Sequence, residues 1–90
     1  MVEAKIVIHG SVQGVFFRSF VKEQAQKLRI TGWVKNEDDG TVKACAQGDR
    51  DTLESFIDIC KIGPSGATVE KVDVEWKTYP DKKFSSFSVG

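Results

Sequence analysis

The stretch from Gly10 to Phe20, GSVQGVFFRSF, places an arginine directly behind a short loop that contains a glycine. Gly14 allows the backbone to bend so that successive N–H groups converge, an arrangement that binds anions. Arg18 adds a planar guanidinium that fits phosphate oxygens. The loop lacks the lysine and the glycine spacing of a Walker P-loop, and it holds no Ser/His/Asp set or metal-ligand spacing. These residue types therefore predict a phosphate cradle.

The N-terminal elements predict where this loop lies. Residues 5–9 are rich in β-branched side chains and stop at Gly10, which predicts a strand. Beyond the loop, apolar residues recur at helical spacing, at Phe17, Val21, Ala25 and Leu28. This pattern predicts an amphipathic helix that begins near Arg18. Because helix N-termini expose free N–H groups and partial positive charge, the helix adds to the predicted anion site.

The rest of the chain adds a hairpin, a second helix and two further strands. Residues 30–36 and 41–47 read as strands joined by a turn at Asp39-Gly40, a strong hairpin signal. Apolar residues at helical spacing then predict a helix, at Leu53, Phe56, Ile57 and Cys60. After a loop at residues 63–66, alternating residues predict a strand over 72–76, and a short last strand follows at 84–89.

The element order βαββαβ plus a terminal strand predicts one α+β domain over residues 1–90. The expected fold is a ferredoxin-like sandwich with one antiparallel sheet and two helices on one face. In that fold the first two strands run parallel, with the third inserted between them. Their C-terminal ends share one edge, so the loop Ser11–Phe17 and Asn36 should lie roughly 10 Å apart. Side chains from both segments could then surround a small ligand.

Composition restricts the partners. The 90 residues carry 13 basic and 13 acidic side chains, and this zero net charge argues against nucleic-acid binding. No apolar run approaches the roughly 20 residues of a membrane span, and the N-terminus does not resemble a signal peptide. Two cysteines are too few for a disulfide scaffold. We expect a cytoplasmic monomer that binds neither nucleic acid nor membrane.

Two segments also resemble the acylphosphatase family. GSVQGVFFR, from Gly10 to Arg18, resembles the first signature of that family, and GWVKN, from Gly32 to Asn36, followed by DGTV, resembles the second. Gly63-Pro64 and the strand at 72–76 also fit the family pattern. The resemblance spans essentially the whole chain, and both signatures together are highly specific.

The resemblance implies hydrolysis of acyl phosphates to a carboxylate and inorganic phosphate, with no metal, no cofactor and no covalent enzyme intermediate. It implies that Arg18 binds the substrate phosphate and that Asn36 orients the attacking water. It also implies that the loop amides cradle phosphate oxygens, at Val12, Gln13, Gly14, Val15, Phe16 and Phe17. Inorganic phosphate or sulfate should compete for the same site.

Other residues have simpler interpretations. We expect Phe16 and Phe17 to pack in the core or the loop, and His9 to lie on a strand surface without a chemical role. Cys60 shares the apolar helix face, whereas Cys45 has the opposite parity to its apolar neighbours, so a disulfide between them is not expected. Glu37 either weakens anion binding from beside Asn36 or points from the turn into solvent.

Alternative functions remain open at this point. A non-catalytic ferredoxin-like module that binds a phosphorylated ligand would keep the cradle without needing Asn36. A nucleic-acid module of the same fold would need an exposed aromatic row on the central strands. A further alternative is an acylphosphatase-like domain of a larger maturation enzyme. We expect the 90-residue length of the chain to argue against it.

Overall fold

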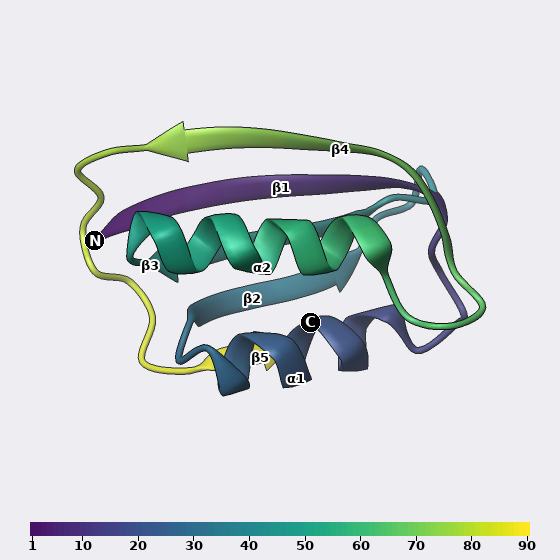
Figure 1. The fold of residues 1–90 in the computed structure, drawn as a ribbon, viewed down its shortest axis with the longest axis horizontal. Helices are drawn as coiled ribbons and strands as arrows, with labels where there is room; N and C mark the ends of the chain where they lie inside the picture. Colours follow the sequence, from purple (N-terminus) through teal and green to yellow (C-terminus); the bar gives the residue numbers. More distant parts are fainter.

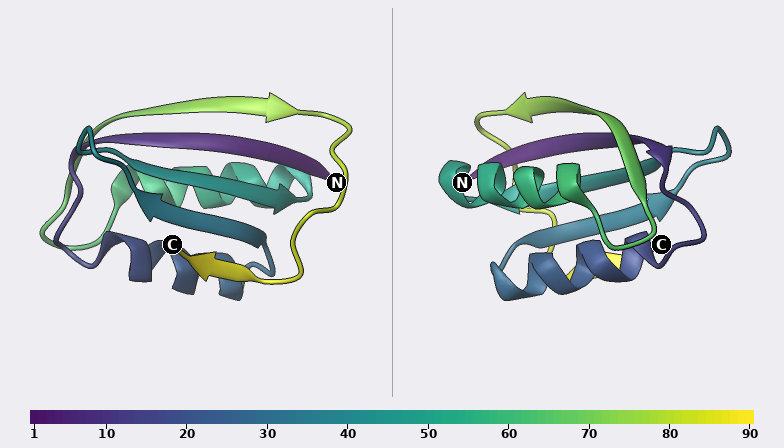
Figure 2. Two further views of the ribbon diagram at one scale, coloured as in Figure 1. Left: turned by 180° about the vertical axis from the view of Figure 1, so that it is seen from behind. Right: turned by 45° about the vertical axis from the view of Figure 1, so that its right-hand side comes forward.

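The computed structural model describes all residues from 1 to 90 and forms two layers, a five-stranded sheet and a pair of helices (Figure 1). The strands are β1 (Val2–Ser11), β2 (Thr31–Asn36), β3 (Val42–Gly48), β4 (Thr68–Lys77) and β5 (Phe87–Val89), and the helices are α1 (Phe17–Lys27) and α2 (Arg50–Ile62). Both helices cover the same face of the sheet, and Figure 2 shows the other face uncovered from behind.

The sheet has the strand order β4-β1-β3-β2-β5. β3 pairs antiparallel with both β1 and β2, so β1 and β2 run parallel to each other and end at the same edge. The predicted ferredoxin-like sandwich is therefore confirmed. β5 adds a fifth strand, parallel to β2, with Gly32 opposite Phe87. The sequence left the direction of this last strand open.

β1 extends beyond the predicted residues 5–9, and it does not stop at Gly10. It runs to Ser11, with an irregularity in its pairing to β4 between His9 and Gly10. Gly10 has a φ of 130°, and a Cβ there would lie 2.1 Å from the carbonyl oxygen of Thr68. This glycine therefore permits close approach of two strands rather than ending one.

The core lies between the sheet and the helices. Alternate residues of the strands point toward the helices, and the apolar faces of α1 and α2 close over them. The largest fully buried apolar side chains of this layer are Ile6, Ile8, Phe17, Leu53 and Phe56. Burial of each such side chain stabilises the fold by about 1.5–3 kcal/mol, so this layer holds the strand ends and the start of α1 in place.

The two cysteines lie on opposite sides of the sheet, as their sequence parity predicts. Cys60 belongs to the core between sheet and helices, and Cys45 is buried outside that core. Both thiols are free. Burial raises the pKa of Cys60 to about 12, so its thiol stays protonated and unreactive at neutral pH. Neither helix has the length and apolar character to cross a membrane.

Candidate active site

The loop between β1 and α1 turns sharply at two residues in the left-handed region. Gly14 has a φ of 77°, and Phe16 at the N-cap position of α1 has a φ of 59°. No side chain caps α1, and its first turn contains no acidic residue. The first N–H groups of a helix have no partner within the helix. The loop therefore presents free donors and the positive end of α1 at one point.

A pocket of about 240 Å³ lies at this point. Its lining residues come from the loop, the first turn of α1, the end of β2 and β5, namely Val12, Gly14, Phe16, Phe17, Arg18, Ser19, Asn36 and Val89. Arg18 and Asn36 thus reach one pocket from separate chain segments, as the shared sheet edge predicts. Of the other predicted cradle residues, Gln13 and Val15 are not among the lining residues.

Arg18 is half-buried and is oriented by Gly90. Its Nη1 donates a hydrogen bond of 2.8 Å to the main-chain oxygen of Gly90. Gly90 is itself tied to β2, since its N–H donates to the carbonyl of Val34 at 2.8 Å. None of the ion pairs in the structure includes Arg18. A main-chain oxygen therefore orients the guanidinium and no Asp or Glu side chain pairs with it, which suits an anion-binding group.

Asn36 is the last residue of β2 and lies on the helix side of the sheet. It has the same parity as Val34, which is fully buried under the helices. Asn36 is half-buried, and its side chain makes no hydrogen bond within the protein. An amide with both donor and acceptor capacity thus faces the pocket without a protein partner.

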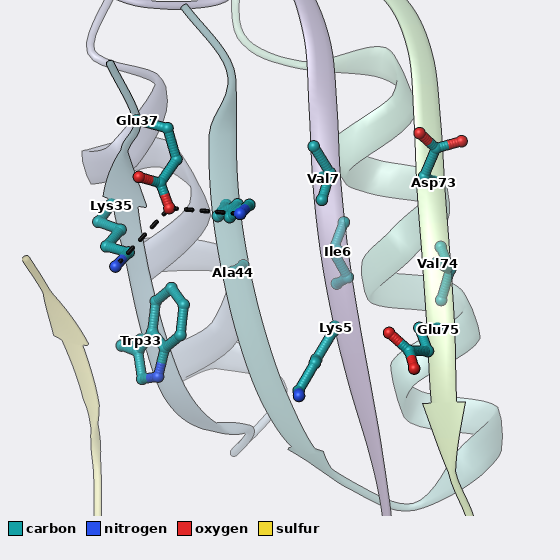
Figure 3. Close-up of a pocket in the computed structure, with 11 residues that line it drawn as sticks. Lys5, Ile6, Val7, Trp33, Lys35, Glu37, Ala44, Asp73, Val74 and Glu75 are labelled. Carbon is teal, nitrogen blue, oxygen red and sulfur yellow. Dashed lines mark ion pairs between the residues drawn. The ribbon is translucent and has the colours of Figure 1, made fainter. Parts of the chain in front are cut away.

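Glu37 points to the opposite face of the sheet from Asn36. Its carboxylate lies 3.7 Å from Nζ of Lys35 and 3.6 Å from Nζ of Lys43, and Figure 3 shows it directed toward these amines on the uncovered face. The adjacent carboxylate therefore does not face the pocket that holds Arg18. Its neighbours are two lysines on the sheet surface rather than bulk solvent alone.

Phe16 corrects one prediction. The sequence suggested that Phe16 and Phe17 both pack in the core or the loop; Phe17 is only 2% exposed, but Phe16 is 85% exposed. The left-handed backbone of Phe16 takes it out of the helical repeat that begins at Phe17, so its side chain does not join the buried face. Periodicity starting at Phe17 was the only signal of this difference.

Two interactions around the pocket had no signal in the sequence. The main-chain oxygen of Gly90 that accepts from Arg18 lies 72 residues away along the chain. The side chain of Gln13 reaches the turn between β2 and β3, with bonds to the carbonyls of Glu37 and Thr41. Both depend on the register of strands that are distant in sequence.

A second hollow, of about 420 Å³, lies on the uncovered face of the sheet (Figure 3). It has charged side chains of both signs, from Lys5, Lys35, Lys43, Glu37, Asp73 and Glu75, together with Trp33. Lys35 lies 5.1 Å from the centre of the Trp33 ring. His9 also lies on this face, with its Nε2 3.0 Å from a carboxylate oxygen of Asp73. No group of three or more His, Cys, Asp or Glu side chains is placed to hold a metal ion.

Comparison with known proteins gives consistent results along the whole chain. The acylphosphatase family model matches residues 4–89. An acylphosphatase of Pelotomaculum thermopropionicum is 44% identical over 86 residues, which cover 96% of this chain and 92% of the relative. The crystal structure of acylphosphatase from Bacillus subtilis superposes with a TM-score of 0.95 at 37% identity, over 100% of this chain and 99% of that one. An acylphosphatase from Coxiella burnetii gives a TM-score of 0.87 at 36% identity, over 99% and 92% of the two chains.

Proposed function

The chain belongs to the acylphosphatase family, and we propose that it hydrolyses acyl phosphates to a carboxylate and inorganic phosphate at the pocket of Arg18 and Asn36. One observation carries the proposal. A guanidinium that pairs with no Asp or Glu side chain and an amide without a protein partner line the same pocket, beside the uncapped start of α1. The larger hollow on the uncovered face offers no such combination.

In the proposed complex, the phosphate group binds between the Arg18 guanidinium and the N–H groups of the loop from Val12 to Phe17. The guanidinium supplies a permanent charge and two parallel donors. The loop amides and the α1 N-terminus supply further donors that need no reorganisation as charge develops on the phosphoryl oxygens. Phosphoryl transfer depends mainly on such positioning and charge stabilisation.

Asn36 is proposed to orient the attacking water through its side-chain oxygen, which accepts a hydrogen bond from that water. The water oxygen bonds to phosphorus while the bond from phosphorus to the acyl oxygen breaks. The acyl group leaves as a carboxylate, a weak base that needs no proton from a general acid. The proton of the water passes to a phosphate oxygen of the substrate, which accounts for a site without an assigned base.

The test is a steady-state assay with a simple aryl acyl phosphate, together with calorimetric binding of inorganic phosphate. The wild type should turn over the substrate and bind phosphate in competition with it. Arg50, an exposed arginine at the start of α2, provides the control variant Arg50→Ala, which should keep both properties. Phosphate binding without any turnover would replace the proposed activity with the non-catalytic binding module. A pH–rate profile that required a protein group near neutral pH would refute the proposed proton route.

A further inference from the structure

The side chain of Gln13 lies outside the pocket and bridges two segments of the site. Its Nε2 donates to the carbonyl oxygen of Glu37 at 2.8 Å and to that of Thr41 at 2.9 Å. These two carbonyls frame the turn that joins β2 to β3, immediately after Asn36. A single amide nitrogen has two hydrogens, so each hydrogen has one acceptor in the turn.

The turn does not need Gln13 for its own structure. Glu37 O already accepts the N–H of Gly40 at 3.2 Å, and Thr41 O accepts the N–H of Glu37 at 2.9 Å. Oδ1 of Asp39 accepts both the N–H and the hydroxyl of Thr41, at 3.0 and 2.6 Å. Removal of Gln13 would therefore leave neither carbonyl without a donor. What its two bonds add is a connection between the turn and the loop.

The side chain of Gln13 makes the only hydrogen bonds between the loop after β1 and the turn after β2. β3 lies between β1 and β2 in the sheet, so the loop after β1 and the end of β2 share no backbone ladder. None of the hydrogen bonds outside the regular elements joins residues 12–16 to residues 36–41, apart from the two made by Gln13. Gln13 and Arg18 belong to one segment, and Asn36 is the neighbour of Glu37 in the other.

We propose that Gln13 is a positioning residue that sets the distance between the phosphate cradle and Asn36, an inference that rests on the proposed hydrolysis. Its role is to hold the strand end, and with it the attacking water, in line with a phosphate bound at Arg18. A misplacement of about 1 Å at a reacting centre lowers the rate by about 10²-fold. Phosphate binding depends on Arg18, the loop N–H groups and the start of α1, and the side chain of Gln13 supplies none of these donors. Loss of the bridge should therefore lower kcat and leave phosphate affinity unchanged.

The first experiment measures kcat, KM and inhibition by inorganic phosphate for Gln13→Met, which keeps the length of the side chain and removes its donors. Gln13→Asn keeps the amide but shortens its reach, and Gln26→Met, at an exposed position of α1, is the matched control. Both Gln13 variants should lose at least about tenfold in kcat, a fraction of the 10²-fold cost of a 1 Å shift. The phosphate inhibition constant should stay within about twofold of the wild type, since the cradle keeps its charged donor. A Gln13→Met protein with wild-type kcat would overturn the proposal.

A double-mutant cycle with Asn36→Ala tests whether Gln13 acts through Asn36. If it does, Gln13→Met should cause no further loss once Asn36 is alanine, because residues that act as one unit are not additive. Full additivity of the two losses would contradict a positioning role.

A third readout does not depend on turnover. The side-chain NH₂ signals of Asn36, the only asparagine of the chain, should shift in the NMR spectrum of Gln13→Met and stay in place in Gln26→Met. Unshifted signals would exclude the mechanical link. If the wild type itself shows no turnover, the proposed function fails, and these signals still decide whether Gln13 couples the two segments.

Discussion

The two hollows of the molecule differ in charge compensation more than in size. The hollow on the uncovered face, at about 420 Å³, is larger than the Arg18 pocket, at about 240 Å³. Two of its lysines, Lys35 and Lys43, share the carboxylate of Glu37. The only hydrogen-bond acceptor of Arg18 is the main-chain oxygen of Gly90, and no Asp or Glu side chain pairs with it. The smaller pocket therefore presents a cation that no side-chain carboxylate shares, whereas the larger hollow neutralises much of its own charge.

Backbone donors separate the two regions further. On the uncovered face, the backbone N–H groups of the central strands point to neighbouring strands and are used in the sheet. At the pocket, the first N–H groups of α1 have no partner within the helix. A phosphate at the pocket can thus bind backbone and side chain together, whereas the sheet surface offers it side chains alone. We infer from this difference that a free helix start and a cation without a side-chain carboxylate partner favour the smaller pocket as the anion site.

The largest expected effect comes from Arg18→Ala, which removes the guanidinium of the pocket. We expect kcat/KM to fall by roughly 10³-fold, the upper end for loss of one charge-stabilising donor. Binding of inorganic phosphate should become undetectable by calorimetry. Arg50→Ala, assayed beside it, should match the wild type. Phosphate binding retained without Arg18 would mean that the anion binds elsewhere, and the uncovered face would be the first region to examine.

Asn36→Ala should have the next largest effect, and a different one. The cradle stays intact, so phosphate affinity should remain within about twofold of the wild type. kcat should fall by about 10²-fold because the attacking water loses its acceptor. Stopped-flow or steady-state assays over a range of substrate concentrations separate the two parameters. Near-normal kcat in this variant would remove water positioning from the role of Asn36.

Glu3 is a buried carboxylate with hydrogen-bond and ion-pair partners. It is 1% exposed, and its Oε1 accepts from Gln47 at 2.8 Å and lies 3.0 Å from Nζ of Lys83. Burial raises the pKa of Glu3, but the hydrogen bonds from Gln47 and Lys83 outweigh it and leave the pKa below its ordinary value of 4.5. At acidic pH the unfolded chain therefore binds more protons than the folded chain. The free energy of unfolding falls as the pH drops through 4.5 toward the lower pKa of the folded state.

Glu3→Gln should remove this part of the acid destabilisation and leave kcat unchanged. Urea unfolding between neutral and acidic pH measures the free energy of unfolding of both proteins. Its slope against pH should differ between them by at most about one proton. Identical slopes would show that Glu3 has the same pKa in the folded and unfolded chains.

The smallest effect is expected from Lys43→Met on the uncovered face. The partly exposed ion pair with Glu37 contributes about 0–1 kcal/mol to the free energy of unfolding, and Glu37 keeps Lys35 at 3.7 Å. Activity and phosphate inhibition should both stay within about twofold of the wild type, because Lys43 is not among the residues that line the Arg18 pocket. A clear loss of phosphate binding would show that the uncovered face and the Arg18 pocket act as one site.

Sequence patterns predicted most of the fold because they reflect local requirements. The helical repeat of Phe17, Val21 and Ala25 and the Asp39-Gly40 turn correspond to an observed helix and hairpin. The meeting of Arg18 and Asn36 at one pocket followed from the topology, since the parallel ends of β1 and β2 share an edge. The strand limits were less accurate, because the ends of β1 and β4 depend on each other's register rather than on their own residues.

The residues of one short segment were enough to predict the turn at Gly14, the arginine behind it and the helix that follows, because glycine conformations, helix termini and side-chain periodicity are properties of neighbours in the chain. The surroundings of that arginine were not accessible in this way. The bond from Arg18 to the main-chain oxygen of Gly90 and the bridge from Gln13 to the β2–β3 turn join segments far apart in the sequence. Such contacts depend on how strands pair and which edge they reach, and this geometry exists only once the sheet has formed.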